Sequence, residues 1–186
     1  TDAAKVALSA SSVNLDGNST TALARGNTAN NSLTYSVGAS YTGLEGAVVT
    51  GVTSAAATAV VLNDQANTGA VTAKSENASY AIVLNSGTGT AMSNSSASLS
   101  NNTVNALAYG NSAVNNLTMG TFGAGLPSSA ISNVQTNGGV IKAEASNVTF
   151  NMGVTGASTG SVIRNTGNGV TAQAVGNSSV STIGGV

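Results

Sequence analysis

The sequence lacks the side chains on which most catalytic and metal-binding sites depend. Its 186 residues include no histidine, no cysteine, no tryptophan and a single proline. Without imidazole or thiol groups, the chain cannot form an ordinary zinc site, attach haem covalently, or use a Cys or His nucleophile. We therefore expect no cofactor, no metal and no enzymatic activity.

Charged residues are also scarce. The chain has 5 Lys+Arg and 6 Asp+Glu, which is 6% of its residues, whereas about 25% is typical of globular proteins. Five cations cannot neutralise much phosphate, so nucleic acid is not an expected partner. No apolar run reaches the ~18 residues of a membrane-spanning helix, so no membrane span is expected. A start at Thr1 without a leader fits a mature secreted chain, or an excised fragment.

Small side chains make up most of the sequence. There are 30 Ala, 26 Ser, 23 Asn, 23 Thr, 23 Gly and 21 Val, while aromatic residues contribute 3%. The formal net charge of −1 and a mean hydropathy of +0.17 argue against disorder, which favours high charge and low hydrophobicity. With so few bulky residues, the fold has to rely on backbone hydrogen bonds and on close packing of small side chains.

An internal repeat is the clearest organised feature. The motif Ala-x-Ala-x-Gly-Asn begins at Ala22, Ala106 and Ala172, and two degenerate copies begin at Val71 and Ile141. We number these copies 1 to 5 in chain order. Three columns of the alignment extend beyond the residues that define the motif. Asn precedes every start by four residues, Ala follows it by two, and a large apolar residue follows it by eleven: Asn18, Asn67, Asn102, Asn137 and Asn168; Ala24, Ala73, Ala108, Ala143 and Ala174; Leu33, Ile82, Leu117, Met152 and Ile183.

Within each copy the apolar residues alternate with period 2, which predicts β-strands. Val104, Ala106 and Ala108 share one face, and a Gly or another small residue follows, as at Gly110, where we expect a turn. Each copy thus predicts three short strands. Because such a unit cannot bury its own inner face, we expect the copies to stack. The predicted fold is an all-β solenoid of about five coils, with three strands per coil.

One repetitive domain is expected over residues 1–186, with repeat cores near 18–35, 67–84, 102–119, 137–154 and 168–186. The starts are separated by 49, 35, 35 and 31 residues. The long first spacing breaks the regularity and favours the alternative fold, a β-sandwich pilin. In a solenoid, the five Asn residues would form a ladder of amides between coils. The other interpretation is that Asn suits a left-handed corner.

The candidate catalytic residues are few. Asp16 and Asp64 precede the Asn column at similar places, so in a rod they would lie on one side, and a carboxylate pair can hydrolyse a glycosidic bond. Surface turn residues are the competing interpretation, which we favour. An ice-binding array would need a regular Thr face, but the outward columns are mixed, for example Thr28, Asn77, Ser112, Asn147 and Ser178.

A resemblance to a known family rests on the turn sequence of the repeat. Tyr109-Gly110-Asn111-Ser112-Ala113 and Val175-Gly176-Asn177-Ser178 resemble the Gly-Asn-x-Ala turn of curlin-type repeats. The whole pattern is also similar to the repetitive surface proteins that anchor bacterial holdfasts. The resemblance implies a secreted β-solenoid that forms extracellular fibres in biofilms.

The functional hypothesis is a structural one. No helix, charge cluster or Pro blocks either end of the expected solenoid, and the surface carries little charge, which favours end-to-end association. We therefore expect a secreted, extracellular or cell-surface filament subunit that assembles with itself by coil stacking or strand exchange. Matrix polysaccharide is a second partner to consider. The alternatives are a segment of a larger adhesin or autotransporter passenger and, ranked lower, a polysaccharide-active or ice-binding solenoid.

Overall fold

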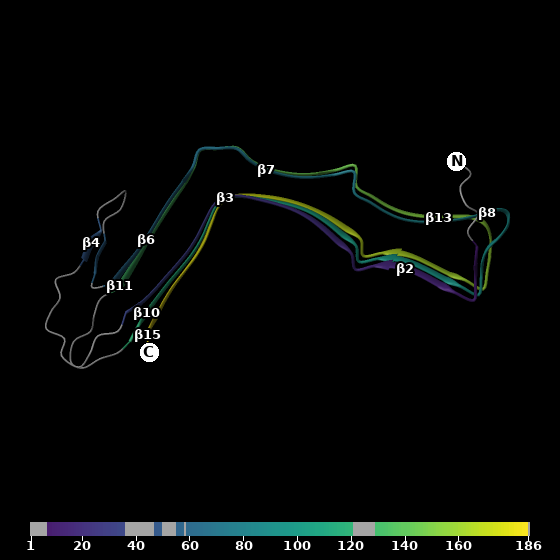
Figure 1. Ribbon diagram of the computed structural model, residues 1–186, viewed down its shortest axis with the longest axis horizontal. Helices are drawn as coiled ribbons and strands as arrows, with labels where there is room; N and C mark the ends of the chain where they lie inside the picture. Colours follow the sequence, from purple (N-terminus) through teal and green to yellow (C-terminus); the bar gives the residue numbers. More distant parts are fainter. Residues whose placement is uncertain (1–6, 36–46, 50–54, 58, 121–128, 186) are drawn as a thin grey trace. The chain divides into compact units, whose positions relative to one another are not determined.

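A computed structural model describes residues 7–35, 47–49, 55–57, 59–120 and 129–185 (Figure 1). All the regular secondary structure in these ranges consists of β-strands, so the fold is all-β as predicted. The strands are β1 (Leu8–Ser9), β2 (Ser12–Asp16), β3 (Ser19–Tyr35), β4 (Ala47–Val49), β5 (Ala55–Ala57), β6 (Ala59–Asn67), β7 (Val71–Glu76), β8 (Ser79–Ser93), β9 (Ser96–Ser100), β10 (Thr103–Met119), β11 (Ser129–Asn137), β12 (Ile141–Ser146), β13 (Thr149–Thr159), β14 (Val162–Thr166) and β15 (Gly169–Gly185).

Alternating burial explains why these residues form strands. In β10, Val104, Ala106 and Ala108 are fully buried, whereas Asn105 and Leu107 between them are partly exposed. Successive side chains of a strand point to opposite faces, so a period of 2 places every second residue inside. The alternation read from the sequence therefore gives both the strand and its inner face.

The sheets are mostly parallel and join segments that are far apart in the sequence. Their orders are β15-β10-β3, β14-β9-β2, β1-β8-β13, β11-β6 and β12-β7, and β4 pairs with β5 antiparallel. In register, Leu15 pairs with Leu99 and Leu99 pairs with Asn165 on the neighbouring strands, while Tyr80 pairs with Phe150. Figure 1 shows β11 running along β6 and β13 along β8.

The register joins alternate copies of the repeat. Copies 1, 3 and 5 lie on β3, β10 and β15 and form one stack, and copies 2 and 4 form another on β6 to β8 and β11 to β13. Equivalent residues that hydrogen bond between stacked copies are 84, 66 or 70 residues apart, as in the pairs Asn18–Asn102, Asn102–Asn168 and Asn67–Asn137. A solenoid of about five coils, in which consecutive copies stack, is therefore not confirmed, because the copies whose strands pair are alternate ones.

The expected turn after the motif is wrong for the odd-numbered copies. Strands β3, β10 and β15 each have 17 residues and continue through Gly26, Gly110 and Gly176. At Gly110 and Asn111 two consecutive residues are buried, so the strand changes phase there without ending. In copy 2, by contrast, β7 ends at Glu76 and Asn77 has a positive φ of 57°.

Glycine is required at Gly26 and Gly110, in copies 1 and 3, because neighbouring backbones approach closely at the change of phase. A Cβ atom on Gly26 would lie 2.5 Å from the carbonyl oxygen of Gly110. A Cβ atom on Gly110 would collide with the carbonyl oxygen of Gly176 and would lie 2.7 Å from Asn137 Oδ1. Only a residue without a side chain lets these layers stack at the ordinary strand spacing.

The described chain divides into two compact units, and the division falls at the same place in all five copies. Unit 1 comprises Thr1–Leu23, Ala73–Leu107 and Ala143–Gln173; unit 2 comprises Ala24–Thr72, Ala108–Lys142 and Ala174–Val186. Each boundary lies directly before the Ala column. Odd-numbered copies thus begin in unit 1 and end in unit 2, and even-numbered copies do the reverse.

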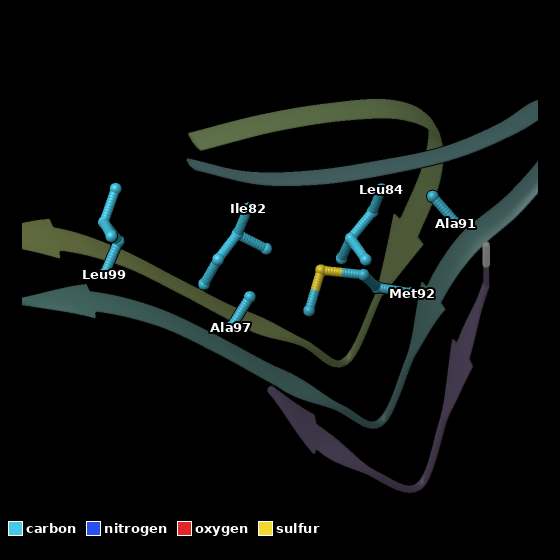
Figure 2. Close-up of a cluster of buried hydrophobic side chains, with 6 residues drawn as sticks. All are labelled: Ile82, Leu84, Ala91, Met92, Ala97 and Leu99. Atoms are coloured by element: carbon cyan, nitrogen blue, oxygen red, sulfur yellow. The ribbon is translucent and has the colours of Figure 1, made fainter. Parts of the chain in front are cut away.

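The core of unit 1 lies between two stacks of strands. Its buried members are Ile82, Leu84, Ala91, Met92, Ala97 and Leu99. Figure 2 shows Ile82 and Leu84 pointing toward the strand that carries Ala97. Tyr80 and Phe150, which pack against this cluster, stack with their ring centroids 5.6 Å apart. Each layer of the stack contributes few large side chains, so neighbouring layers complete one another's packing.

Unit 2 has a smaller apolar core. Ala59 and Val61 of β6 pack with Leu117 and Met119 of β10, and Leu33, Tyr35 and Ile131 lie against them. The same strands carry buried amides, including Asn63, Gln65 and Asn115. The inner face of unit 2 is thus partly apolar and partly polar.

We predict that Gly110→Ala destabilises the protein, since the added methyl group meets backbone as well as the Asn137 side chain. Overpacking of this kind costs about 1–3 kcal/mol. Gly184→Ala is the matched control, because a Cβ atom there has nothing within 4 Å. Thermal unfolding followed by circular dichroism measures both. Equal melting temperatures for the two variants would contradict the close approach.

Candidate functional site

The Asn column forms an amide ladder through unit 1. Asn18 Nδ2 donates to Asn102 Oδ1 over 2.9 Å, and Asn102 Nδ2 donates to Asn168 Oδ1 over 2.9 Å. The backbone N–H groups of Asn18 and Asn102 donate to the same two oxygens, over 3.0 and 2.9 Å. Asn102 also donates to the carbonyl of Leu15 over 2.7 Å. Each amide therefore binds the layer next to it, and Asn102 is fully buried between the other two.

The remaining two residues of the column form a separate ladder in unit 2. Asn67 Nδ2 donates to Asn137 Oδ1 over 2.7 Å and to the carbonyl of Gly69 over 2.9 Å. The five Asn residues thus make one ladder of three rungs and one of two, as the stacking of alternate copies requires. The left-handed corners are at the residues just before the column in unit 1: φ is 70° at Gly17, 55° at Asn101 and 67° at Gly167.

Further ladders, which the sequence analysis missed, run through unit 2. The Asn of the Gly-Asn pair stacks across three layers, where Asn27 donates to Asn111 and Asn111 to Asn177 over 2.9 and 2.8 Å. Asn31 donates to Asn115 over 2.8 Å. On the facing strands, Asn63 donates to Asn133 over 2.6 Å, and Gln135 donates to Gln65 over 2.7 Å. One signal was present: Asn-x-Gln-x-Asn occurs at both 63–67 and 133–137.

Hydrogen bonds within the ladders satisfy the polar side chains that are buried in the interior. Asn102, Asn111 and Asn115 each have no exposed surface. In the described part of the chain, no buried side-chain nitrogen or oxygen is left without a hydrogen-bond partner. Each bond contributes about 1 kcal/mol net, whereas an unpaired buried amide costs about 1–3 kcal/mol. The ladders therefore stabilise stacking and also fix its register.

The Ala column and the large apolar column divide in the same way. Ala24, Ala108 and Ala174 lie in unit 2, and Ala73 and Ala143 lie in unit 1. Leu33, Leu117 and Ile183 belong to β3, β10 and β15, while Ile82 pairs in register with Met152. The buried members of these two columns are Ala73, Ala108, Leu117 and Ile82.

The last layer leaves its inner apolar residues half exposed. Val170 is 50% exposed, although Val104 in the same column of the middle layer is fully buried. Ile183 is 52% exposed, and Leu117 in its column is 1% exposed. These side chains have the same type as their buried equivalents, and β15 is an outer strand of its sheet, with no described strand paired beyond it. They form an unpartnered inner face on β15.

The two candidate carboxylates are not brought together in one unit. Asp16 lies on β2 in unit 1, and Asp64 lies on β6 in unit 2. Asp16 Oδ1 accepts hydrogen bonds from the hydroxyls of Ser98 and Ser100 and from the backbone N–H of Ser100, all over 2.8 Å. These bonds, that of the Ser100 hydroxyl first, lower the pKa of Asp16. Asp16 thus has a structural role as a link between β2 and β9.

The other charged residues that the structure describes lie on the outer face of the strands. Lys74 forms an ion pair with Glu76, and Glu76 and then Glu144 on the adjacent strand raise the pKa of Lys74. Arg25 lies 6.0 Å from the ring centroid of Tyr109. Within the described ranges no three acidic side chains gather where they could hold a metal ion, and no helix could cross a membrane.

We predict that Asn102→Ala destabilises the fold by about 1–3 kcal/mol, because it leaves the amides of Asn18 and Asn168 without their shared partner. Asn105→Ala serves as the control, since Asn105 faces outward and donates to Thr21 Oγ1 over 3.3 Å. Chemical denaturation measures the loss. If the control variant loses as much free energy of unfolding as Asn102→Ala, the ladder is not a main source of stability.

The lowered pKa of Asp16 predicts a dependence of stability on acid. A carboxyl group with a depressed pKa in the folded state stabilises the fold above its unfolded pKa of about 3.9. That stabilisation is lost as the pH falls through the lower, folded pKa. We expect Asp16→Asn to flatten the decline in melting temperature below about pH 4. An unchanged acid profile would show that the Ser98 and Ser100 bonds do not favour the charged form.

Comparisons with known proteins identify no relative of this chain. No protein-family model, curated protein or solved structure matches the chain. Function is therefore inferred from the ladders, the strand edges and the exposed inner face of the last layer.

Proposed function

We propose that the protein is a structural subunit of a secreted bacterial filament, in a biofilm matrix or on the cell surface. Subunits associate head to tail, and the added chain continues the stack of strands. The observation that carries the proposal is the inner face of β15, where Val170 and Ile183 are half exposed although their equivalents one layer earlier are buried. A further layer of the same repeat would cover them.

Free strand edges support this proposal. β2 and β14 are the outer strands of one described sheet, and β3 and β15 are the outer strands of another. Outer strands present backbone N–H and C=O groups that pair readily with another chain. Natural proteins often block such edges with charges or prolines. Here the 17 residues of β15 contain no charge and no proline.

The composition favours assembly over catalysis. The interior combines amides with apolar side chains, and its Asn, Gln and Ala columns repeat from layer to layer. In cross-β stacks identical side chains, Asn and Gln above all, bond along the stacking direction. We propose no catalytic role, since Asp16 is engaged with Ser98 and Ser100 and lies in a different unit from Asp64.

The alternative is a segment of a larger adhesin or passenger domain. In that case further repeats of one long chain would cover β15, and a second subunit would not be needed. Both proposals expect strands to stack on this face, but they differ in what the 186-residue chain does in solution.

The test is electron microscopy and fibre diffraction of the purified chain at increasing concentration. We predict unbranched filaments that lengthen with concentration and need no cofactor, with a repeat of about 4.8 Å along the axis. The double variant Val170→Lys, Ile183→Lys puts charges on the exposed inner face and should block elongation. Leu23→Lys, Val83→Lys is the matched control, because these residues are 51% and 59% exposed on outward-facing positions.

Compact monomers at all concentrations would contradict the filament proposal and favour the adhesin segment. Equal assembly of both double variants would show that filaments form through a surface other than the inner face of β15.

A further inference from the structure

Two members of the Asn column are followed by glycine. They are Asn137, at the end of β11, and Asn168, between β14 and β15. They form the two Asn-Gly dipeptides of the sequence, whereas Ser19, Thr68 and Thr103 follow the other three members of the column. In Asn-Gly an asparagine loses its side-chain amide most readily, because glycine leaves the following backbone nitrogen unhindered. The column thus holds its two chemically most labile asparagines at equivalent places.

The fold does not require glycine after either asparagine. A Cβ atom on Gly169 would have nothing within 4 Å, and one on Gly138 would have the carbonyl oxygen of Asn67 at 3.9 Å, an ordinary contact. Neither glycine has a positive φ. Gly169 also begins β15, and glycine weakens a strand. By contrast, a Cβ atom on Gly110 or Gly139 would collide with neighbouring backbone.

We propose that Asn137 and Asn168 are sites of spontaneous deamidation, and that stacking of the layers keeps them unreactive. In this reaction the backbone nitrogen of the following glycine loses its proton and attacks Cγ of the asparagine. The N–Cγ bond forms, the Cγ–Nδ2 bond breaks, and ammonia leaves a cyclic imide. Water then opens the imide at either carbonyl, so the product is aspartate or isoaspartate. The reaction needs water alone, and it does not depend on the proposed filament.

The stack holds both groups that would react at Asn137. The Gly138 N–H donates to the carbonyl of Asn67 over 2.8 Å, so this nitrogen is engaged. Asn137 Oδ1 accepts from Asn67 Nδ2 over 2.7 Å, and Asn137 Nδ2 donates to the carbonyl of Gly139 over 3.0 Å. Both bonds to Asn67 join two layers. They therefore protect Asn137 only while β11 is paired with β6.

Asn168 is held in the same way in unit 1. The Gly169 N–H donates to the carbonyl of Asn102 over 2.9 Å. Asn168 Oδ1 accepts from the backbone N–H and the Nδ2 group of Asn102, both over 2.9 Å. Asn168 Nδ2 donates to the carbonyl of Leu99 over 2.9 Å and to Asn165 Oδ1 over 2.7 Å. Local opening of this layer would break the bonds to Asn102 and free the glycine nitrogen.

Deamidation would prevent an opened layer from closing again. An aspartate has acceptors alone, so it cannot replace the Nδ2 donor. At position 168 a charged oxygen would face the carbonyl of Leu99, and at position 137 it would face that of Gly139. Isoaspartate also inserts a carbon atom into the main chain, which disturbs the register of the strand. Opening of a layer is therefore followed by a covalent change that makes the opening irreversible.

Peptide mass spectrometry of the full chain tests the assignment of the sites. The protein is incubated in mildly alkaline buffer, either folded or unfolded in urea, and aspartate and isoaspartate are quantified at each asparagine. In urea we expect Asn137 and Asn168 to react at least about tenfold faster than Asn102, because the β-branched Thr103 hinders the attacking nitrogen. In the folded chain we expect both to react at least about tenfold more slowly than in urea.

Two results of this experiment would overturn the proposal. Equal rates in the folded and the unfolded chain would show that stacking does not protect Asn137 and Asn168. Equal rates at Asn137, Asn168 and Asn102 in urea would show that the Asn-Gly pairs are not preferred sites.

The double variant Gly138→Ala, Gly169→Ala separates this chemistry from the fold. It keeps both asparagines, and its added methyl groups meet no close contact. We expect it to deamidate in urea at least about tenfold more slowly than the parent chain, because each Cβ atom hinders the nitrogen. After the same long incubation the variant should refold and the parent chain should not. Refolding of the fully deamidated parent chain would contradict the irreversible step.

Asn168→Asp supplies one product directly and gives an answer even if neither chain refolds from urea. We expect its melting temperature to fall by at least about 2–4 °C, or the variant not to fold at all, since its carboxylate faces the carbonyl of Leu99. Asn151→Asp is the control, because Asn151 is exposed on the outer face of β13. Equal melting temperatures for the two variants would contradict the damage assigned to deamidation.

Discussion

Hydrogen bonding of buried amides between layers is the interaction on which the rest of the structure depends. Apolar clusters fill only part of the interior. Asn102, Asn111 and Asn115 are fully buried beside them and therefore depend on protein groups as hydrogen-bond partners. Each amide can be satisfied by an equivalent amide in the next layer, at the strand spacing of about 4.8 Å. A buried amide without such a partner costs about 1–3 kcal/mol. The requirement for a partner in the same column therefore fixes which strands pair, in what register and in which direction.

The same constraint explains the repeat columns and the places where they fail. Layers approach closely only where side chains are small, so Ala108 is fully buried and Gly26 and Gly110 lie where neighbouring backbones nearly touch. A layer with partners on both sides buries its Val and Leu residues, as at Val104 and Leu117. The last layer, β15, exposes the same residue types, as at Val170 and Ile183. The exposed inner face of β15 is thus a consequence of stacking, and it is also the surface on which the proposed assembly depends.

Much of the fold was predictable from the sequence, because alternation with period 2 and repeated columns reflect strand geometry directly. The all-β class and the stacking columns at Asn102, Ala108 and Leu117 were found in this way. The order of stacking was not, because all five copies look alike at these columns and nothing local distinguishes a neighbour 35 residues away from one 84 residues away. The change of phase at Gly110–Asn111 was predicted as a turn, since a Gly after an alternating stretch often marks one. The inner ladder of Asn63 and Gln65 was missed because a buried polar strand reads as a surface strand.

The most direct test of this account asks which copies are neighbours within one chain. The side chains of Asn105 and Thr21, from copies 3 and 1, are 3.3 Å apart. The position of copy 2 that corresponds to Thr21 is Ala70. In dilute, monomeric protein, the variant Thr21→Cys, Asn105→Cys should close an intramolecular disulfide under mild oxidation, and Thr21→Cys, Ala70→Cys should not. Closure of the second pair but not of the first would mean that consecutive copies stack, which would contradict the arrangement of alternate copies.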